Sequence, residues 1–418
     1  MLQIKKSDHL KWKVTIGGSK NAVLPIMAAS LLIPGKVVLH NVPEIGDVYT
    51  YLDILSEIWV IYSFCDNTLI LDSTDLKKAH FDLEKIKKIR VSILLLAPIL
   101  QRLGEISIPT PGGCNLGARS IESHLEGLKN IGYDIEMQEE MISLSWSSDA
   151  GERTINAGFW VTPTENLIVA NVLRSGRTTI MLWAIEPHVM NLIDFLRAAW
   201  ANISIRYDNT IIIDWVSALK TDIDFEVISD YIQSGTYMIM WALAAEEYIT
   251  IEKACVDDLY VFIQKMREAW VRIDIQDNDT LRVYRASELK AVDIQTNIFP
   301  GFPTDLQSPF ALLMTQATGS SMIHEVLFEG RLGWTIELEK MWVPVNLLNR
   351  HECEIKGPTA LIGTTVASWD LRAWAAMVIA GLIASGQTTI TQVEYIYRWY
   401  DKLVWNLKSL GADIREIK

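Results

Sequence analysis

Lys20, Arg90 and Arg372 each stand close to the start of a long apolar segment, where a helix is expected to begin. A cation is disfavoured at the positive end of a helix dipole, but the free N–H groups of a helix N-terminus bind anions. A cation in that position indicates that an anion is bound there as well. Since a planar guanidinium holds two oxygens at once, these positions predict a site for phosphate or carboxylate groups.

Uncharged polar residues occupy the same place before other apolar segments. Thr164, Ser234 and Thr304 are of the types that cap helix N-termini, because their hydroxyl oxygens accept hydrogen bonds from free N–H groups. We therefore interpret these three residues as N-caps. Polar side chains thus gather at one recurring point of the sequence, and a binding site is expected there.

The segment PTPGGCNLGARSI surrounds Cys114 with glycines and places Arg119 shortly after it. Closely spaced glycines give the backbone freedom that a mobile lid needs. A cysteine on such a loop, beside an arginine, can have a lowered pKa and be reactive. The alternative is a buried, inert thiol, for which glycine neighbours are unusual. The other cysteines lack this context and are expected to be structural: Cys65, Cys255 and Cys353.

Composition limits the class of protein. The 4 cysteines form no CxxC pair, which favours free thiols in a reducing cytoplasm over disulfides or a zinc site. The net charge of −13 argues against nucleic acid as a partner. No apolar run is long enough to predict a membrane span, and the first residues lack the apolar core of a signal peptide. We therefore expect a cytoplasmic protein that acts on small molecules.

The elements that position these residues repeat with a period of about 70 residues. In each copy a helix end meets a small or aromatic residue and then a strand. The residue at that junction is, in chain order, Trp59, Gly132, Trp200, Trp270, Trp342 and Gly411. We interpret the four tryptophans, which replace the glycine of the other two copies, as additional core residues at a tight turn.

Each copy contains an apolar helix, a strand, an amphipathic helix and further strands. Helices that are apolar on every side are buried, so we expect an α/β fold of two three-repeat domains, each with three buried helices ringed by sheets and outer helices. One domain would contain 1–20 and 229–418, and the other 21–228 with the Cys114 loop. If the buried helices of each domain run parallel, their N-termini converge on one surface, and a site is expected in the cleft between the domains.

The segments GGSKNAVLP, PGGCNLGAR, FPTDLQ, FEGR and DLRA together resemble those of the UDP-N-acetylglucosamine 1-carboxyvinyltransferases, a branch of the enolpyruvyl transferase family. The likeness runs from about residue 11 to 418, in order. It implies an inside-out α/β barrel of two domains, each with threefold pseudosymmetry. It also implies a reaction in which phosphoenolpyruvate gives its enolpyruvyl group to the 3′-hydroxyl of UDP-N-acetylglucosamine by addition and elimination, without a metal or cofactor.

The resemblance also assigns roles. Cys114 matches the lid cysteine linked to proton transfer and to trapping by fosfomycin, and Asp305 matches the base for the sugar hydroxyl; Lys20 and Arg398 match catalytic cations. Residues matching the phosphoenolpyruvate site are Lys20, Asn21, Arg119, Arg331, Arg372 and Arg398. Residues matching the UDP-N-acetylglucosamine site are Asn21, Arg90, Arg119, Ser120, Ile121, Glu122, Ser123, His124, Thr162, Thr164, Asp305 and Leu327.

Several positions depart from the family pattern and leave alternatives open. Gly158, His188, Tyr231 and Phe299 replace residues that the family usually has there. One alternative is a non-catalytic paralogue that binds a nucleotide sugar, and another is an enolpyruvyl transferase for a different alcohol. Asp305 could be a helix N-cap instead of a base. The leading hypothesis remains the peptidoglycan-synthesis enzyme, important for cell shape and division, as a monomer or weak homo-oligomer.

Overall fold

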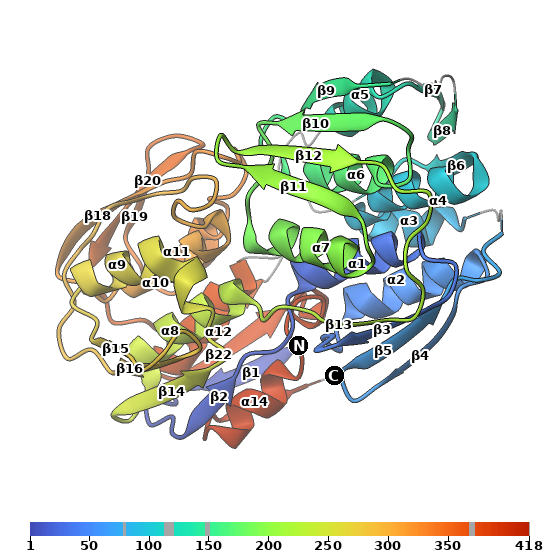
Figure 1. Ribbon diagram of the computed structural model, residues 1–418. Coiled ribbons are helices and arrows are strands. Elements are labelled where there is room, and N and C mark those ends of the chain that lie inside the picture. The colour runs from blue at the N-terminus through green and yellow to red at the C-terminus, as the bar shows by residue number, and fades with distance from the viewer. Residues whose placement is uncertain (78–80, 113–120, 147–150, 368–372, 418) are drawn as a thin grey trace. The chain divides into compact units, whose positions relative to one another are not determined.

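Two compact units make up the part of the chain that the structure describes. The computed structural model describes residues 1–77, 81–112, 121–146, 151–367 and 373–417 (Figure 1). Within these ranges, unit 1 contains 1–17 and 229–417, and unit 2 contains the residues between 18 and 228. The cleft expected between two domains stays a prediction.

Unit 2 alternates helices with strands from its first residues onward. Its helices are α1 (Lys20–Ser30), α2 (Gly46–Glu57), α3 (Leu83–Lys88), η1 (Arg90–Leu95), α4 (Leu96–Leu103), α5 (Glu122–Asn130), α6 (Val161–Asn171) and α7 (Pro187–Ala198). Its strands are β3 (Lys36–His40), β4 (Ile61–Cys65), β5 (Thr68–Asp72), β6 (Glu105–Pro109), β7 (Tyr133–Gln138), β8 (Met141–Trp146), β9 (Arg153–Asn156), β10 (Arg177–Met181), β11 (Asn202–Arg206), β12 (Thr210–Asp214) and β13 (Ile223–Glu226).

Unit 1 combines both ends of the chain. Its helices are α8 (Tyr231–Ala244), η2 (Val256–Leu259), α9 (Tyr260–Glu268), η3 (Thr304–Leu306), α10 (Gln307–Met314), α11 (Thr335–Lys340), α12 (Ala373–Ile383), α13 (Glu394–Tyr397) and α14 (Leu403–Ser409). Its strands are β1 (Leu2–Lys5), β2 (Lys13–Thr15), β14 (Tyr248–Glu252), β15 (Ile273–Ile275), β16 (Thr280–Tyr284), β17 (Ile294–Gln295), β18 (Gly319–His324), β19 (Val345–Leu347), β20 (Glu352–Gly357), β21 (Thr365–Ala367), β22 (Gln387–Thr391) and β23 (Ile414–Glu416).

The sheets confirm that one supersecondary unit is repeated. Within the described ranges there are six sheets, and the four-stranded ones share one order: β13-β3-β5-β4, β9-β10-β12-β11, β2-β14-β16-β15, β17-β18-β20-β19 and β21-β22-β1-β23. In each of them the first two strands are parallel and the other neighbours are antiparallel. The sixth sheet has the order β6-β8-β7. Except for β2, which follows β1, the parallel strand comes after a hairpin of another sheet and so joins two repeats.

The apolar helices are buried, as the sequence predicted. Every residue of α10 is buried, and so is nearly every residue of α1, α6 and α8. In unit 1, α8, α10 and α12 contact one another, and in unit 2, η1 contacts both α1 and α6. Gly235 permits close packing in unit 1, because a Cβ on this α8 residue would lie 2.4 Å from Leu306 of η3. Each unit therefore has its own core, formed by these helices and the inner faces of its sheets.

The four repeat tryptophans are exposed, so the interpretation as additional core residues is wrong. Trp59, Trp200, Trp270 and Trp342 retain 58%, 68%, 59% and 72% of their accessible surface. Their φ angles are 69°, 72°, 69° and 73°, and the glycines of the other two copies also have positive φ. A left-handed residue is the common way to end a helix, and glycine adopts it without steric cost. Backbone conformation therefore defines these positions, and the indole rings point to solvent.

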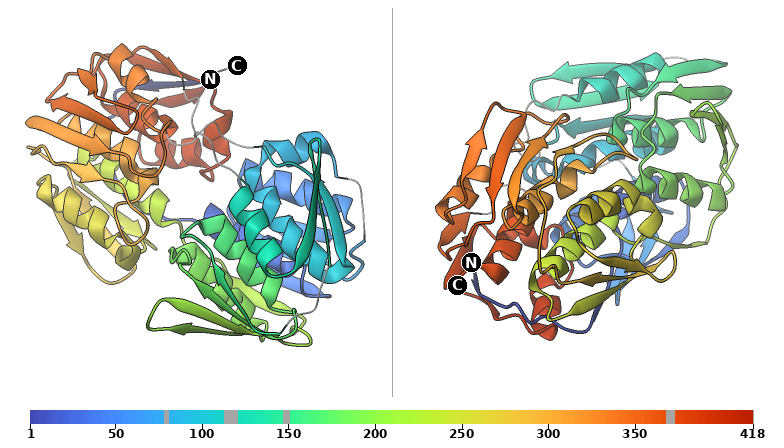
Figure 2. Two further views of the ribbon diagram at one scale, coloured as in Figure 1. Left: turned by 90° about the horizontal axis from the view of Figure 1, so that it is seen from above. Right: turned by 90° about the vertical axis from the view of Figure 1, so that its left-hand side faces the viewer.

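No helix in the described ranges is both long enough and apolar enough to cross a membrane. The first and last strands lie together in one sheet, where β1 pairs with β23. The amino group of Met1 donates a hydrogen bond to the carbonyl oxygen of Ile417 at 2.9 Å. The two ends of the chain are therefore adjacent, as both Figure 1 and Figure 2 show.

Candidate active site

Lys20 is the first residue of α1 and is paired with a carboxylate that the sequence analysis did not single out. Its Nζ lies 2.5 Å from Oδ2 of Asp47, in the first turn of α2. Both residues are buried, with 6% and 3% exposure. Gly18 allows this approach, because a Cβ there would lie 1.6 Å from the carbonyl oxygen of Asn41. Asp47 therefore balances the charge of Lys20 and fixes its direction, while the neighbouring Asn21 is half-buried.

Four consecutive residues expected to bind UDP-N-acetylglucosamine, 121–124, form the start of α5. Ile121 and Ser123 are half-buried, Glu122 is exposed and His124 is buried. Nδ1 of His124 lies 3.0 Å from the amide nitrogen of Asn166, a donor, so Nδ1 accepts. Nε2 must then carry the hydrogen, which it donates to Thr162 Oγ1 at 3.0 Å. His124 and Thr162, two predicted nucleotide-binding residues, are thus in direct contact.

Arg90 acts on the same cluster through its charge. It begins η1, is half-buried, and burial lowers the pKa of its guanidinium. Burial and, secondarily, the charge of Arg90 lower the pKa of His124 to about 3. The imidazole is therefore neutral at physiological pH, as its hydrogen bonds require. Arg90 contributes the positive charge of this cluster, and the hydrogen bond between His124 and Thr162 holds these two side chains in place.

The three residues interpreted as N-caps have other partners, so that interpretation is wrong. Thr164 lies inside α6, where its hydroxyl donates to Trp160 O and accepts from Ala184 N. Ser234 lies inside α8, whose N-cap is Asp230; that carboxylate accepts from the N–H groups of Ile232 and Gln233. Both helices begin a few residues earlier than the hydroxyl positions indicated, which periodicity alone could not show.

Asp305 and Arg331 meet in unit 1. Asp305 belongs to η3, and neither η3 nor α10 has a side-chain N-cap. Instead, Asp305 Oδ1 accepts a hydrogen bond of 2.7 Å from Nη2 of Arg331. Nη1 of Arg331 donates to Thr304 Oγ1, so Thr304 is not a cap either. Arg331 is 2% exposed. The structure thus brings Asp305, the predicted base, together with Arg331, a residue predicted to bind phosphoenolpyruvate. It does not support the alternative in which Asp305 only caps a helix.

Of the remaining predicted site residues, the structure describes Leu327 and Arg398, and the others lie outside the described ranges. Leu327 is half-buried and its N–H donates to Glu325 at 2.9 Å. Arg398 is half-buried at the end of α13. The residues outside the described ranges are Cys114, Arg119, Ser120 and Arg372.

A buried acid in unit 2 was also missed by the sequence analysis. Glu165, in the first turns of α6, is 1% exposed, and its Oε1 accepts no hydrogen bond from the described residues. Burial, with the charge of Glu186 as a second cause, raises its pKa well above the usual value. Burial, with Glu165 as a second cause, likewise raises the pKa of the Tyr51 hydroxyl. Helix periodicity could not reveal this group, because its neighbours come from α2 and the segment before α7.

Two of the positions that depart from the family pattern lie against each other. The rings of Tyr231 and Phe299 meet edge to face with centroids 6.5 Å apart. Tyr231 is 7% exposed at the start of α8, and His188, another departure, is 4% exposed in α7. Tyr231 and Phe299 thus form one aromatic contact beside the N-terminus of a buried helix.

The three described cysteines are poor nucleophiles. The carboxylate of Asp66 raises the pKa of the exposed Cys65 thiol, and burial raises the pKa of Cys353 to about 12. Burial also raises the pKa of Cys255, with nearby aspartates adding to the effect. A thiolate is therefore disfavoured at each of them.

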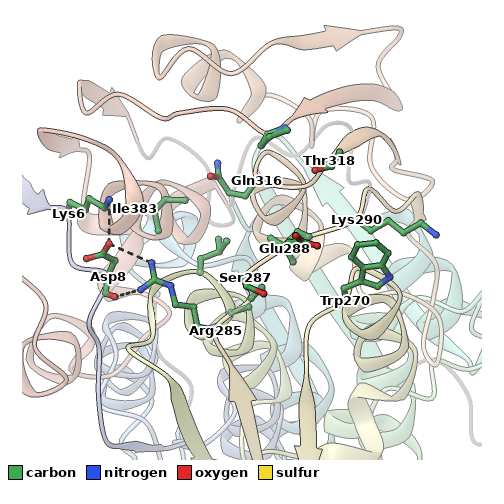
Figure 3. Close-up of a pocket in the computed structure, with 15 residues that line it drawn as sticks. Lys6, Asp8, Trp270, Arg285, Ser287, Glu288, Lys290, Gln316, Thr318 and Ile383 are labelled. Atoms are coloured by element: carbon green, nitrogen blue, oxygen red, sulfur yellow. Dashed lines mark hydrogen bonds and ion pairs between the residues drawn. The ribbon is translucent and has the colours of Figure 1, made fainter.

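A pocket of about 740 Å³ in unit 1 is lined by none of the predicted site residues that the structure describes. Its lining includes Ala242 and Leu243 at the end of α8, Ile383 at the end of α12 and Gln316, which follows α10. Figure 3 shows Ile383 and Gln316 among the lining residues. Asp8 holds Arg285 at one side of the pocket through the Asp8 backbone oxygen and carboxylate. The pocket thus lies at the C-terminal ends of the buried helices, whereas Asp305 and Asp230 lie at N-terminal ends.

Comparisons with known proteins agree over the whole length. The family model for EPSP synthase (3-phosphoshikimate 1-carboxyvinyltransferase) matches residues 4–407. The UDP-N-acetylglucosamine 1-carboxyvinyltransferase 1 of Caldanaerobacter subterraneus is 37% identical and covers 98% of both chains. The UDP-N-acetylglucosamine 1-carboxyvinyltransferase of Finegoldia magna is 35% identical over 100% of this chain and 99% of its own.

Solved structures show the same fold. The enolpyruvyl transferase NikO from Streptomyces tendae superposes with a TM-score of 0.90 at 23% identity, covering 99% of this chain and 98% of its own. The EPSP synthase of Acinetobacter baumannii gives a TM-score of 0.75 at 15% identity, covering 99% of both chains. The expected architecture, a two-domain inside-out α/β barrel of six repeats, is confirmed.

Proposed function

The chain belongs to the enolpyruvyl transferase family, and we propose that it transfers the enolpyruvyl group of phosphoenolpyruvate to the 3′-hydroxyl of UDP-N-acetylglucosamine. The observation that carries this proposal is the full-length identity of 37% and 35% to two proteins named for that reaction. The site geometry supports it, because Asp305 is held by Arg331 at 2.7 Å and does not cap a helix.

The chemistry requires an acid, a base and several cations. The acid protonates the methylene carbon of phosphoenolpyruvate while the sugar oxygen bonds to the adjacent carbon. The base takes the proton from the sugar hydroxyl, and a tetrahedral ketal forms. Loss of a proton from the new methyl group and of inorganic phosphate then gives the enol ether. We assign the base to Asp305, since a carboxylate within reach of the hydroxyl suits general base catalysis.

The cations hold the two anionic groups of phosphoenolpyruvate. Lys20 and Arg331 are buried and oriented by carboxylates, so little side-chain entropy is lost when an anion binds. Preorganised charges of this kind stabilise charge that develops during a reaction. We assign the remaining cationic roles to Arg119, Arg372 and Arg398, and proton transfer at the lid to Cys114.

Nucleotide binding is assigned to unit 2. The neutral His124 holds Thr162 through its Nε2 hydrogen, and Arg90 provides positive charge beside them. A hydroxyl and a guanidinium are suitable partners for a diphosphate. The segment from Arg119 to His124 is assigned to the uridine.

We place this reaction in the cytoplasm, at the start of peptidoglycan synthesis, on which cell shape and division depend. Fosfomycin, an epoxide, is expected to alkylate the thiol of Cys114. The raised pKa values of Cys65, Cys255 and Cys353 support this selectivity, because a thiol reacts as its thiolate.

The test is release of inorganic phosphate from purified protein with both substrates, combined with mass analysis of the product. Phosphate release that requires UDP-N-acetylglucosamine, and a product heavier by one enolpyruvyl group, are expected. Nucleotide binding without phosphate release would instead support the non-catalytic paralogue. Release with another alcohol, but not with this nucleotide sugar, would support a transferase of different specificity.

A further inference from the structure

Glu325 is a buried carboxylate whose acceptor sites are all used. It follows β18 and is 0% exposed. Oε2 accepts from Thr304 Oγ1 at 2.6 Å and from Gln307 Nε2 at 3.1 Å. Oε1 accepts from the N–H groups of Leu327 at 2.9 Å and Phe328 at 3.2 Å. A carboxylate with four donors satisfies the requirement for burying such a charge.

These hydrogen bonds have a fixed direction. A carboxylate can only accept, so the Thr304 hydroxyl must donate its single hydrogen to Glu325. The lone pairs of that hydroxyl are then available to Arg331, which can only donate. The other end of the guanidinium donates to Asp305. Glu325 therefore determines which group donates and which accepts in the series of hydrogen bonds that runs from Glu325 through Thr304 and Arg331 to Asp305.

Glu325 also shapes the loop that carries Arg331. Its carboxylate accepts from the backbone of Leu327 and Phe328, so the chain folds back around it. The ring of Phe328 lies 4.8 Å from the guanidinium carbon of Arg331. Through Thr304 and Gln307, the same carboxylate holds the start of α10. One side chain thus joins the segment with the base to the segment with the cation.

We propose that Glu325 is the positioning residue for the Asp305–Arg331 pair. It touches neither substrate; it acts by holding Thr304 as a donor and the Arg331 loop in place. The proposal rests on the proposed function, because the position of Asp305 matters only if that carboxylate takes a proton. It predicts that the identity of the group at 325, carboxylate and not amide, controls turnover more than substrate binding.

The decisive variant is Glu325→Gln, which keeps the size of the side chain. Its NH₂ group must face two of the four donors. If it faces Thr304 and Gln307, the hydrogens of both donors lose their acceptor and Thr304 is no longer held in place by residue 325; if it faces Leu327 and Phe328, the loop loses its anchor. In both cases Arg331 moves from Asp305. We expect kcat to fall by about 10- to 100-fold, with KM for either substrate changed less than about threefold.

Two matched variants test the relay itself. Thr304→Val removes the hydroxyl at nearly constant volume and should reproduce the loss in kcat, whereas Thr304→Ser keeps the hydroxyl and should restore it to within about threefold of wild type. The control is His351→Phe. His351 Nδ1 donates to the backbone oxygen of Glu325 at 2.7 Å, so this change disturbs the same loop without altering the carboxylate. Its kcat should stay within about threefold of wild type.

A structural measurement separates this proposal from the proposed function. In a crystal structure of Glu325→Gln, the Arg331–Asp305 separation should exceed the 2.7 Å of the wild-type chain. If wild-type protein releases no phosphate, the proposed function fails, and this distance still tests the relay. An unchanged distance, an unchanged kcat, or equal losses in Thr304→Val and Thr304→Ser would each overturn the proposal. Melting temperatures identify any variant that is simply unfolded.

Discussion

At the scale of single residues, two buried cations of this protein each lie against a carboxylate. Lys20 is buried against Asp47, and Arg331 is buried against Asp305. Breaking a buried pair leaves a charge without compensation, which costs far more than losing an exposed pair. Stability and catalysis are therefore linked at these positions, and the two effects must be separated by experiment.

The Lys20–Asp47 pair gives the first prediction. Asp47→Asn should lower the free energy of unfolding by about 3–5 kcal/mol, because the buried ammonium group loses the negative charge that lies 2.5 Å from it. The double variant Lys20→Met with Asp47→Leu should recover most of that loss without recovering turnover. Urea denaturation and phosphate release measure the two effects. Glu252→Gln, which breaks the exposed pair with Lys13, is the control and should cost less than about 1 kcal/mol.

Asp305→Asn gives the second prediction. An amide cannot act as a general base, so kcat should fall by roughly 10² or more, with substrate binding retained. The buried Arg331 also loses its negative partner, so the melting temperature should fall. Calorimetry and steady-state kinetics measure both. Wild-type turnover in this variant would leave the mechanism without its base.

Glu165 gives a prediction about pH. Its pKa in the folded protein is raised, so the folded state keeps a proton that the unfolded chain has released. The stabilising contribution of this group is therefore complete below the unfolded value of 4.5 and is lost as pH rises above it. Glu165→Gln carries no titrating group, so its melting temperature should gain on that of wild type as pH rises from about 5 to 7.5.

The control for this pH series is Glu136→Gln, which neutralises an exposed carboxylate on β7. Its melting temperature should differ from that of wild type by a constant amount across the series. If Glu165→Gln gives an equally flat difference, the buried carboxyl is not protonated in the folded state.

At the scale of elements, the left-handed turn at the end of the amphipathic helices limits which residue types fit at that position. Four helices end at a tryptophan in the left-handed region, which disfavours residues with a Cβ. The copies that have glycine, at Gly132 and Gly411, make the same turn with φ of 90° and 102°. The helix-to-strand junction is thus conserved in geometry between repeats even where the residue differs.

This junction gives a prediction on stability. Trp342→Gly should raise the free energy of unfolding by about 0.5–1 kcal/mol, because glycine adopts the left-handed turn without strain and the exposed indole packs little. Trp405 is the matched control: it is equally exposed, at 68%, but lies inside α14. Trp405→Gly should lower stability by about 0.5–1 kcal/mol. A loss at both positions in denaturant melts would show that the indole of Trp342 is stabilising.

At the scale of the whole molecule, the two units differ in how the chain forms them. The described residues of unit 2 all lie between 18 and 228, whereas unit 1 contains residues from both ends of the chain. β1 lies inside the sheet β21-β22-β1-β23, between β22 and β23, and β2 extends the sheet of β14. A fragment that lacks the first residues therefore loses a central strand, β1, as well as the edge strand β2.

This arrangement predicts how fragments behave. A permuted unit 1, in which residues 229–418 are joined through a short glycine linker to 1–17, should fold, because Met1 N and Ile417 O are 2.9 Å apart. The fragment 229–418 alone should show no cooperative unfolding. Circular dichroism during urea titration compares them. Equal unfolding curves would mean that β1 contributes little to this core.

The sequence determined the repeated unit, the buried helices and the family. Each of these rests on local patterns: a fixed period, segments that are apolar on all sides, and short motifs around Lys20 and Asp305. Backbone hydrogen bonding and burial act within a few residues of such patterns, so they can be read from the chain alone.

Only the tertiary structure decided which groups meet. Asp47 is far in sequence from Lys20, Glu165 from Tyr51 and Glu325 from Thr304, and no local pattern marks them. The tryptophans at the junctions were misjudged for the same reason, since side-chain type suggested burial while the position of the turn at the surface exposed them. Thr304 was misjudged as a cap because its hydroxyl donates to Glu325. Burial makes an unpaired polar group costly, so the fold, and not the local sequence, selects the partner of each buried charge.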